Sequence, residues 1–535
     1  MTNWNFAAVW ETVASVRGDA PALVHGSRVI TWSAFEQRAA GVAASLLAAG
    51  LGHQAKVALY LRNVPEYMEG AFAAMKAGLV PVNTNYRYQV DELQYLWENA
   101  DVEAVLFQAD YRPLVDSLRE RLPGVKLWLQ VGGLRTRDGV VDYETAAGSG
   151  ARVAASDHLG AEDVWLIYTG GTTGMPKGVI WRQHDIYLAS NTAGDPAEAD
   201  LESVAQRLSR ASASPVGMPA APLMHGTGFV FATTILGRGG TLATADDPSF
   251  DAARLLDTID ARRVSDLCIV GDAFARPIAD ALDADPARWD LACLRTISSS
   301  GMVWSAAVKQ RLLAHLPEVL LVDFLNSSEA SGMGRAIASN RQQGRAAFKL
   351  GDRALVVDDD GRPLVAGAEG IGRLAVRGLT PLGYYKDPER SARTFPVIDG
   401  VRYAIPGDLA RQLADGGIEL LGRGSTCINT GGEKVFPEEV EAAIKTCAGV
   451  RDALVVGLPD PRFGEVVAAV VEGDGSSAPD ADAVIAHVRA QLARHKAPRH
   501  VMVVSDVQRT VSGKADYPAV RARLLQWLGA SPPSA

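Results

Sequence analysis

Tyr168-Thr-Gly-Gly-Thr-Thr-Gly-Met-Pro-Lys-Gly-Val179 is the stretch of the chain that says most about its fold and its chemistry. Between Thr169 and Gly178 it holds four glycines, three threonines and one lysine. Glycines let backbone N–H groups approach a phosphate closely, hydroxyls add hydrogen bonds, and a lysine adds a positive charge. The stretch therefore predicts a loop that wraps a polyphosphate. Its candidate contacts are Thr169, Gly170, Gly171, Thr172, Thr173, Gly174 and Lys177.

A Walker A loop is the obvious alternative, but the residues do not fit it. Lys177 follows a proline rather than a glycine, and Gly178 stands where Ser or Thr is required. The flanking segments Val164–Tyr168 and Gly178–Trp181 both have the pattern of strands, whereas a Walker loop opens a helix. A glycine-rich hairpin without a binding role stays open as the second interpretation.

Length and composition indicate an ordinary globular protein of more than one domain. The chain has 535 residues, 47% of them hydrophobic and 21% charged, and its net charge is −9. The charge is diffuse, so no nucleic-acid partner is expected. Four cysteines without metal-binding spacing suggest reduced thiols in a cytoplasmic protein. No segment is long and apolar enough to predict a transmembrane span, and neither a secretion signal nor a lipidation motif is expected.

The first half of the chain alternates strand and helix patterns. Strands are expected at 28–32, 56–60, 79–82 and 102–107, with helices near 35–47, 65–78 and 91–99. This alternation predicts an α/β fold with parallel, helix-covered sheets. After about residue 345 the pattern changes to short antiparallel strands and tight turns, and after 423 to a small α+β unit.

The 168–179 motif resembles the phosphate-binding signature of the acyl-adenylate-forming enzymes, which include acyl-CoA synthetases, stand-alone adenylation domains and firefly-type luciferases. The resemblance runs through motifs between 168 and 514. It implies a large N-terminal domain over 1–424, with parallel helix-covered sheets and a small β-barrel-like subdomain. A mobile α+β C-terminal domain over 425–535 would follow. It also implies ATP and Mg²⁺ as cofactors and coenzyme A as a substrate.

Further segments match the family residue by residue. Asn326-Ser-Ser-Glu329 resembles its phosphate and metal segment, so Asn326, Ser327 and Ser328 are expected at the nucleotide and Glu329 at the magnesium ion. Leu325 and Asn326 replace the usual aromatic-Gly pair there. Gly301 and Met302 resemble the backbone that passes the adenine ring, and His225, in Pro222–Gly228, corresponds to a residue beside the bound carboxylate.

The resemblance continues in the second half of the chain. Asp408 is expected to accept hydrogen bonds from the ribose hydroxyls, and Arg423 to lie near ribose and α-phosphate. Gly431, Gly432 and Lys434, in the Thr430–Lys434 segment, would line the path of the CoA thiol. Lys514, which ends Arg509-Thr-Val-Ser-Gly-Lys514, corresponds to the catalytic lysine of adenylation. Ser425 stands where the family has a charged hinge residue.

These motifs predict an enzyme that activates a small-molecule carboxylic acid and transfers it to CoA. The segments at 180–186, 326–329 and 422–434 are most similar to bacterial ligases for long-chain fatty acids or sterol side chains. Delivery of the acyl-adenylate to a separate carrier protein, an aryl or medium-chain substrate, a luciferase and a silent nucleotide-binding relative stay open as alternatives. Because the chain ends shortly after Lys514, we expect free CoA as the acceptor. A homodimer and peripheral membrane contact also stay open.

Overall fold

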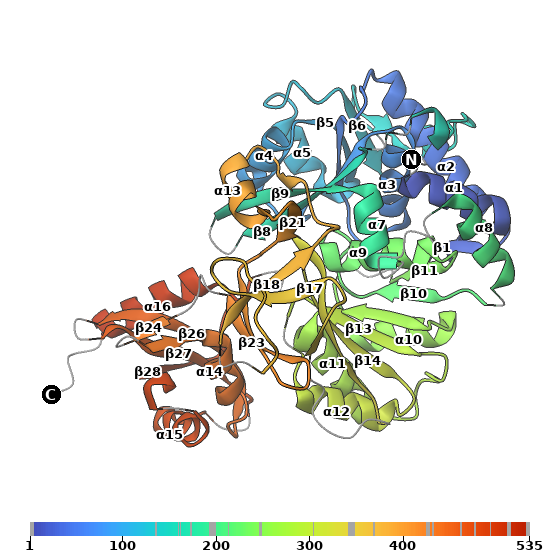
Figure 1. Ribbon diagram of the computed structural model, residues 1–535. Helices are drawn as coiled ribbons and strands as arrows, with labels where there is room; N and C mark the ends of the chain where they lie inside the picture. Colours follow the sequence, from blue (N-terminus) through green and yellow to red (C-terminus); the bar gives the residue numbers. More distant parts are fainter. Residues whose placement is uncertain are drawn as a thin grey trace. The chain divides into compact units, whose positions relative to one another are not determined.

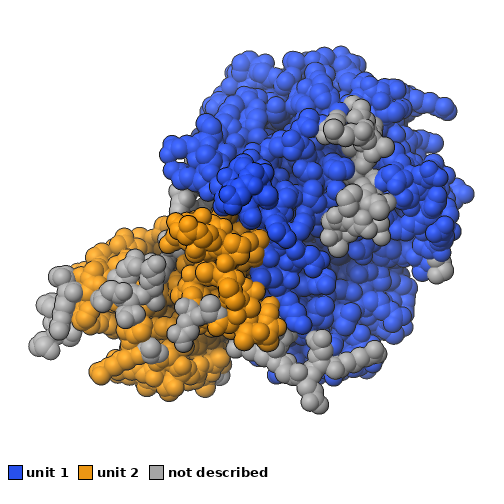
Figure 2. Space-filling model, viewed as in Figure 1, with its two compact units in different colours: residues 1–170, 175–354, 376–404 blue, residues 171–174, 355–375, 405–535 orange. Residues whose placement is uncertain are grey.

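The computed structural model describes most of the chain, in two compact units that are treated separately below (Figure 2). Unit 1 comprises 1–170, 175–354 and 376–404, and unit 2 comprises 171–174, 355–375 and 405–535. The domain boundary expected between 424 and 425 falls outside the described residues and stays a prediction. The described residues are 5–133, 136–158, 160, 162–171, 174–191, 200–211, 213–245, 249–302, 304–340, 348–367, 370–423, 428–430, 433–460, 463–475, 478–492, 494–510 and 515–530.

The first sheet of unit 1 carries the glycine-rich motif. Its strand order is β19-β9-β8-β4-β3-β5-β6-β7, and the pairs from β8 to β7 are parallel. Figure 1 labels β5, β6, β8 and β9 of this sheet. Helices α3 (Pro65–Lys76), α4 (Val90–Asn99) and α5 (Arg112–Leu118) alternate with these strands, which confirms the predicted alternation. The strands are β19 (Gly383–Tyr384), β9 (Gly174–Arg182), β8 (Val164–Gly171), β4 (Val80–Asn83), β3 (Lys56–Tyr60), β5 (Val102–Gln108), β6 (Leu127–Val131) and β7 (Val141–Asp142).

A second sheet in unit 1 runs in the order β2-β1-β11-β10-β12-β13-β14-β15-β16. Its pairs from β1 to β14 are parallel, whereas β2, β15 and β16 pair antiparallel. The strands are β2 (Arg28–Thr31), β1 (Pro21–His25), β11 (Thr241–Thr244), β10 (Val216–Pro219), β12 (Asp266–Ile269), β13 (Thr296–Ser300), β14 (Leu320–Ser327), β15 (Ala330–Ala338) and β16 (Phe348–Leu350).

The N-terminal end of this sheet differs from the sequence prediction. The predicted first strand, 28–32, is the second arm of a hairpin whose first arm is β1, and the turn contains Gly26 at a φ of +54°. Trp32 begins helix α2 (Trp32–Ala48) instead of ending the strand, because the Thr31 hydroxyl accepts the Ala34 N–H and caps the helix.

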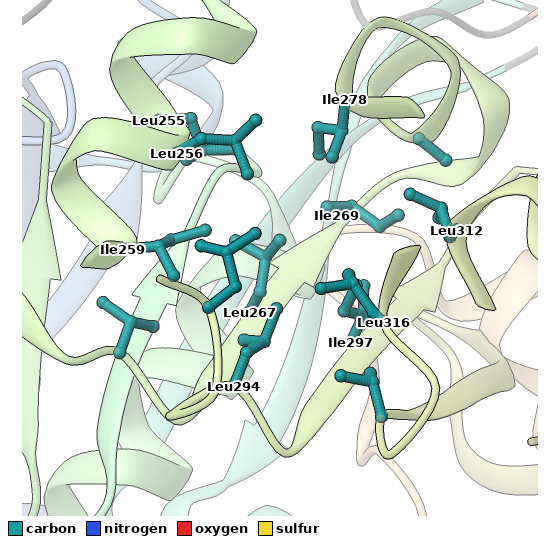
Figure 3. Close-up of a cluster of buried hydrophobic side chains, with 14 of the residues drawn as sticks. Leu255, Leu256, Ile259, Leu267, Ile269, Ile278, Leu294, Ile297, Leu312 and Leu316 are labelled. Carbon is teal, nitrogen blue, oxygen red and sulfur yellow. The ribbon is translucent and has the colours of Figure 1, made fainter. Parts of the chain in front are cut away.

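The core of the second sheet is a layer of leucine and isoleucine side chains under three helices. Helices α10 (Ala252–Arg262), α11 (Gly271–Ala284) and α12 (Ala306–His315) pack on β12, β13 and β14, and Figure 3 shows this cluster of buried hydrophobic side chains. Elsewhere in unit 1, helix α1 (Phe6–Arg17) is tied to α2 and α3 by a buried ion pair. The ammonium of Lys76 is fully buried and binds both Glu11 and Glu36. A buried ammonium requires such partners because it has lost its hydration.

Antiparallel strands follow residue 350, as predicted. β18 (Gly372–Arg377) and β17 (Ala354–Val357), which lie mostly in unit 2, pair with each other. β18 also pairs antiparallel with β22 (Asp408–Gln412), which pairs antiparallel with β23 (Gly417–Arg423). In unit 1, β20 (Val397–Ile398) and β21 (Val401–Ala404) also form an antiparallel pair.

The C-terminal part of unit 2 is an α+β arrangement. Its sheet has the order β25-β24-β27-β26, with β28 parallel to β27. Alternate side chains of β26 and β27 pack against α14 and α15 on one face and against α16 on the other, because side chains of a strand point to opposite faces in turn. The elements are β25 (Glu433–Val435), β24 (Ile428–Thr430), β27 (Gly464–Gly473), β26 (Val450–Asp460), β28 (His500–Val504), α14 (Pro437–Ile444), α15 (Ala481–Gln491) and α16 (Tyr517–Ala530).

Of the remaining described helices, α9 (Gly226–Gly237) packs on β10, β11 and β12 of the second sheet. The others are α6 (Tyr143–Ala147), α7 (Gln183–Asn191), α8 (Leu201–Arg210) and α13 (Pro388–Thr394). Within the described ranges, no helix combines the length and the apolar character that crossing a bilayer requires. Cys268, Cys293 and Cys447 carry free thiols, and Cys427 lies outside the described residues.

Candidate active site

The glycine-rich motif is built on two neighbouring strands of the first sheet. The sequence predicts a loop from Thr169 to Gly178, but β8 continues to Gly171 and β9 starts at Gly174, so strands enter the motif from both sides. Thr169 and Lys177 are half-buried. Thr172 and Thr173 lie outside the described residues, and Gly170, Gly171 and Gly174 are described only as parts of these strands.

Gly178 is a glycine for a reason other than phosphate contact. A Cβ atom at this position would lie 2.7 Å from Cε2 of Tyr168 and 2.9 Å from Cδ1 of Leu166, both on β8. Such distances are too short for a real Cβ, so the close packing of β9 on the Tyr168 ring requires glycine. Gly178, which was not among the predicted phosphate contacts, is thus required by packing between β8 and β9.

Asn83, which ends β4, holds the start of the motif through both polar atoms of its side chain. Its Oδ1 accepts the Tyr168 N–H at 2.7 Å, and its Nδ2 donates to the Tyr168 carbonyl at 2.8 Å. The same Nδ2 donates to the carbonyl of Met224 at 2.7 Å, next to His225. Asn83 therefore joins the phosphate motif to the segment expected to border the carboxylate. Sequence reasoning missed it, although its place at the carboxyl end of a parallel strand was a usable signal.

A second asparagine holds the rest of the His225 segment. The Nδ2 of Asn63 donates to the carbonyls of Pro219 and Ala221, and its Oδ1 accepts the Leu223 N–H at 2.7 Å. His225 is half-buried and is the N-cap residue of α9. Backbone carbonyls and an N–H group of this connection are thus satisfied by a side chain from the segment between β3 and α3.

The predicted adenine segment lies against the first turn of α9. Gly301 has a φ of +90°, which favours glycine, and a Cβ there would lie 3.8 Å from Oγ1 of Thr227. The buried Ser299 accepts the Gly271 N–H at 2.9 Å through its hydroxyl. Met302 is half-buried. Unit 1 therefore brings the 299–302 segment beside the residues that follow His225.

Glu329, the predicted metal residue, sits in the turn between β14 and β15. Ser327 and Asn326 close this turn with their side chains, because Ser327 Oγ accepts the Ala330 N–H at 3.1 Å and Asn326 Oδ1 accepts the Gly332 N–H at 2.7 Å. The phenol of Tyr384 donates to Oε1 of Glu329 at 2.8 Å. Burial, followed by the nearby charge of Glu329, raises the pKa of Tyr384, so the phenol keeps its proton at neutral pH and acts as the donor.

The predicted nucleoside residues belong to unit 2. The buried Asp408 begins β22 directly after Gly407, which has a φ of +100°. In the antiparallel register Asp408 lies opposite Arg423, the last residue of β23. The backbone thus pairs the two residues that the family resemblance assigns to the ribose and α-phosphate.

The remaining predicted residues are described only in part or not at all. Ser328 lies in the described turn, but Ser425, Gly431, Gly432 and Lys514 lie outside the described residues. Arg423 and Lys434 are placed in strands by their backbone alone. Their expected roles stay predictions.

The residues on either side of the lysine segment are anchored in unit 2. Arg509 donates to Asp452 from Nε at 2.6 Å and from a terminal nitrogen at 2.9 Å. Lys445 also binds Asp452, at 2.9 Å. Beyond the segment, the Tyr517 phenol hydrogen-bonds the buried Glu441, whose pKa is raised by burial. A bidentate Arg–carboxylate pair fixes orientation as well as distance, so the chain enters the Lys514 segment from a defined point.

Glu329 fits a magnesium ion shared with a nucleotide. Mg²⁺ is usually held by one or two carboxylates together with substrate phosphates and water. An ionised carboxylate offers about four acceptor positions, and Tyr384 occupies one of those of Glu329. In the part of the chain that the structure describes, no group of three or more His, Cys, Asp or Glu residues could hold a metal. A carboxylate with acceptor positions beyond the one used by Tyr384 suits a magnesium ion that also takes phosphate and water ligands.

Comparison with solved structures defines the class of fold. The anthranilate CoA ligase AuaEII, solved with anthranoyl-AMP, superposes with a TM-score of 0.82 at 22% identity, covering 99% of this chain and 98% of that one. ATP-bound MatB from Rhodopseudomonas palustris gives 0.79 at 24% identity, covering 97% and 99%. The chain therefore has the α/β fold of adenylating enzymes, with a large N-terminal part and a smaller C-terminal one.

Sequence comparison identifies the family. The AMP-binding enzyme family matches residues 10–385, and the AMP-binding enzyme C-terminal domain matches residues 439–514. This chain belongs to the AMP-binding enzyme family, as the motifs predicted.

Curated relatives match the chain over nearly its whole length. The medium-chain acyl-CoA ligase Mig of Mycobacterium avium is 37% identical, over 96% of this chain and 97% of its own. A medium/long-chain-fatty-acid–CoA/3-oxocholest-4-en-26-oate–CoA ligase of Mycobacterium marinum is 38% identical over 96% and 95%. The 3-oxocholest-4-en-26-oate–CoA ligase of Rhodococcus rhodochrous is 35% identical over 96% and 94%.

Proposed function

We propose that this chain is an AMP-forming acid–thiol ligase that converts a carboxylic acid, ATP and CoA to acyl-CoA, AMP and diphosphate. A carboxylate oxygen would attack the α-phosphorus and displace diphosphate, and the CoA thiol would then attack the acyl carbon and displace AMP, losing its proton. The acid is proposed to be a long-chain fatty acid or the carboxylated side chain of a steroid. The relatives at 35–38% identity, whose names state such activities, support this choice.

The observation that carries the proposal is the bridge made by Asn83. Its side chain bonds the backbone of Tyr168, where the phosphate motif starts, and the carbonyl of Met224, next to His225. Adenylation must bring a carboxylate and a phosphate together, and holding both reactants in one frame removes much of the entropic barrier. A side chain that joins the two proposed binding segments supports such a reaction.

The proposed roles of the other residues follow from the chemistry of two reacting anions. Asp408 would hold the ribose hydroxyls, Lys514 would offset the charge that gathers between carboxylate and α-phosphate, and Glu329 would hold the magnesium ion. That ion neutralises the departing diphosphate when it is bound. The glycines at 431 and 432 would face the acyl carbon after the 425–535 domain rotates about Ser425.

Thioester formation with a panel of acids tests the proposal. The purified chain is incubated with ATP, Mg²⁺, CoA and one of acetate, benzoate, octanoate, palmitate or a steroid carboxylic acid, and loss of the CoA thiol is followed. We expect the fastest loss with palmitate or the steroid acid. Acid-dependent ATP–diphosphate exchange without thioester would favour a separate carrier protein. Preference for benzoate or octanoate would favour an aryl or medium-chain ligase, and absence of exchange with every acid would contradict an enzyme of this class.

We also propose that the enzyme acts in the cytoplasm. A homodimer and peripheral membrane contact are further predictions, which light scattering and cosedimentation with lipid vesicles test directly.

A further inference from the structure

Two side chains of the first sheet donate hydrogen bonds to the turn that contains Glu329. The indole Nε1 of Trp181, on β9, donates to the Ser328 carbonyl at 2.8 Å. The phenol of Tyr384, on β19, donates to Oε1 of Glu329 at 2.8 Å. Trp181 is 1% exposed and Tyr384 is 9% exposed, so solvent competes little for either hydrogen bond.

Tyr384 is itself held firmly. Its strand pairs antiparallel with β9, where Tyr384 lies opposite Val179, and its N–H donates to the Ser391 hydroxyl at 2.8 Å. Its ring packs against Phe395, with the centroids 5.4 Å apart. The backbone and the ring therefore hold the phenol in place at the Glu329 carboxylate.

Trp181 lies on the strand that leaves the phosphate motif, and Tyr384 lies on the strand paired with it. Trp181 lies on β9 four residues after Lys177, and the two residues that flank β19 donate their N–H groups to the carbonyls of Ile180 and Gly178 on β9. The turn with Ser328 and Glu329 is thus joined to the phosphate motif through side-chain hydrogen bonds rather than through the chain.

We propose that Tyr384 and Trp181 are positioning residues for the magnesium–nucleotide complex. Tyr384 orients the Glu329 carboxylate, and Trp181 fixes the backbone of Ser328, so that the metal residue keeps a constant position relative to the phosphate motif. Partners that orient a metal ligand commonly change metal affinity 10- to 100-fold when they are removed. This inference rests on the proposed function, in which Glu329 holds magnesium.

The test is the magnesium dependence of ATP binding, measured by titration calorimetry on the full chain. Tyr384→Phe removes one hydroxyl and keeps the ring against Phe395. We expect ATP affinity at limiting Mg²⁺ to fall about tenfold or more, while affinity in EDTA stays at the wild-type value. Trp181→Phe, which removes the donor to Ser328, should show a smaller change in the same direction.

The neighbouring residue offers a matched control. The Tyr385 phenol also donates to a carboxylate, Oδ2 of Asp101 at 2.8 Å, but that carboxylate is not the metal residue. Tyr385→Phe should leave the magnesium dependence unchanged. In a Glu329→Gln background the Tyr384→Phe change should have no further effect on magnesium dependence, since Tyr384 acts through Glu329.

The outcomes separate this inference from the function on which it rests. If Glu329→Gln weakens magnesium-dependent binding and Tyr384→Phe does not, the positioning role is wrong and the metal role stands. A fall in ATP affinity that is equal in Mg²⁺ and in EDTA would assign Tyr384 a purely structural role and overturn the inference. If Glu329→Gln leaves the magnesium dependence at the wild-type value, the metal role and the positioning role both fail.

Discussion

Asn83 and Tyr168 are joined by a reciprocal pair of hydrogen bonds, in which the side-chain amide of one satisfies both backbone groups of the other. This pair fixes the amide orientation, since only Oδ1 can accept and only Nδ2 can donate. The second proton of Nδ2 is used by the Met224 carbonyl. The start of the phosphate motif and the segment before His225 are therefore held by one side chain.

The first prediction concerns this bridge. Asn83→Ala removes three hydrogen bonds, each worth about 1 kcal/mol. The segments that contain Tyr168 and Met224 would then no longer be held at a fixed distance, although the reaction needs its two reactants in a defined geometry. We expect the rate of acid-dependent ATP–diphosphate exchange to fall about 10- to 100-fold. Asn340→Ala is the control, because Asn340 also donates to a backbone carbonyl, that of Leu313, on helix α12. Equal rates in the two variants would show that Asn83 has no special role in catalysis.

The second prediction concerns nucleotide binding. Asp408→Ala should weaken the binding of both ATP and AMP, because hydrogen bonds from two ribose hydroxyls to a charged acceptor are lost, on the order of 1.5–3 kcal/mol each. Calorimetric titration with AMP isolates this contact from the metal and the diphosphate. Wild-type affinity for AMP in the folded variant would remove Asp408 from the site.

The third prediction separates the two half-reactions. Lys514→Ala should slow adenylation by about 10²-fold or more, as loss of a charge-stabilising donor does. The same variant should still convert supplied acyl-AMP and CoA to thioester, because the thiol step would use the other face of the mobile domain. Equal loss of both steps would contradict a rotating domain. Ser425→Pro, which restricts φ at the expected hinge, should show the reverse pattern.

The fourth prediction concerns the stability of unit 2. Burial alone would raise the pKa of Asp452, but Arg509 and Lys445 outweigh it and lower that pKa to about 2. Because the folded pKa lies below the unfolded value of about 3.9, the carboxylate stabilises the fold by about 2 to 3 kcal/mol at pH 5 and above, and this is lost as the pH falls toward 2. Asp452→Asn should therefore lower the urea midpoint at pH 5 and pH 7 alike, with a smaller difference at pH 3. A difference that grows on acidification would refute this assignment.

Much of the fold follows from local patterns. Strand and helix periodicity located β3, α3, α4 and β5, because each of these elements buries residues at a regular spacing along one face or along its whole length. The hairpin arm β1 was missed because its five residues contain a proline and lie close to a helix. The motif at 168–179 was enough to predict the family, whose model matches residues 10–385.

The sequence by itself thus determined the class of fold, the family and the residues whose types suit a phosphate, a metal and a ribose. Only the tertiary structure showed that Gly178 accommodates the Tyr168 ring, and that Asn83, Trp181 and Tyr384 hydrogen-bond the segments that hold the candidate site residues. These three side chains have no motif of their own, since asparagine, tryptophan and tyrosine serve many purposes. Their roles arise from hydrogen bonds between segments that are distant in sequence, up to 147 residues apart for Trp181 and Ser328. Such pairings are set by strand order and register, which local sequence does not encode.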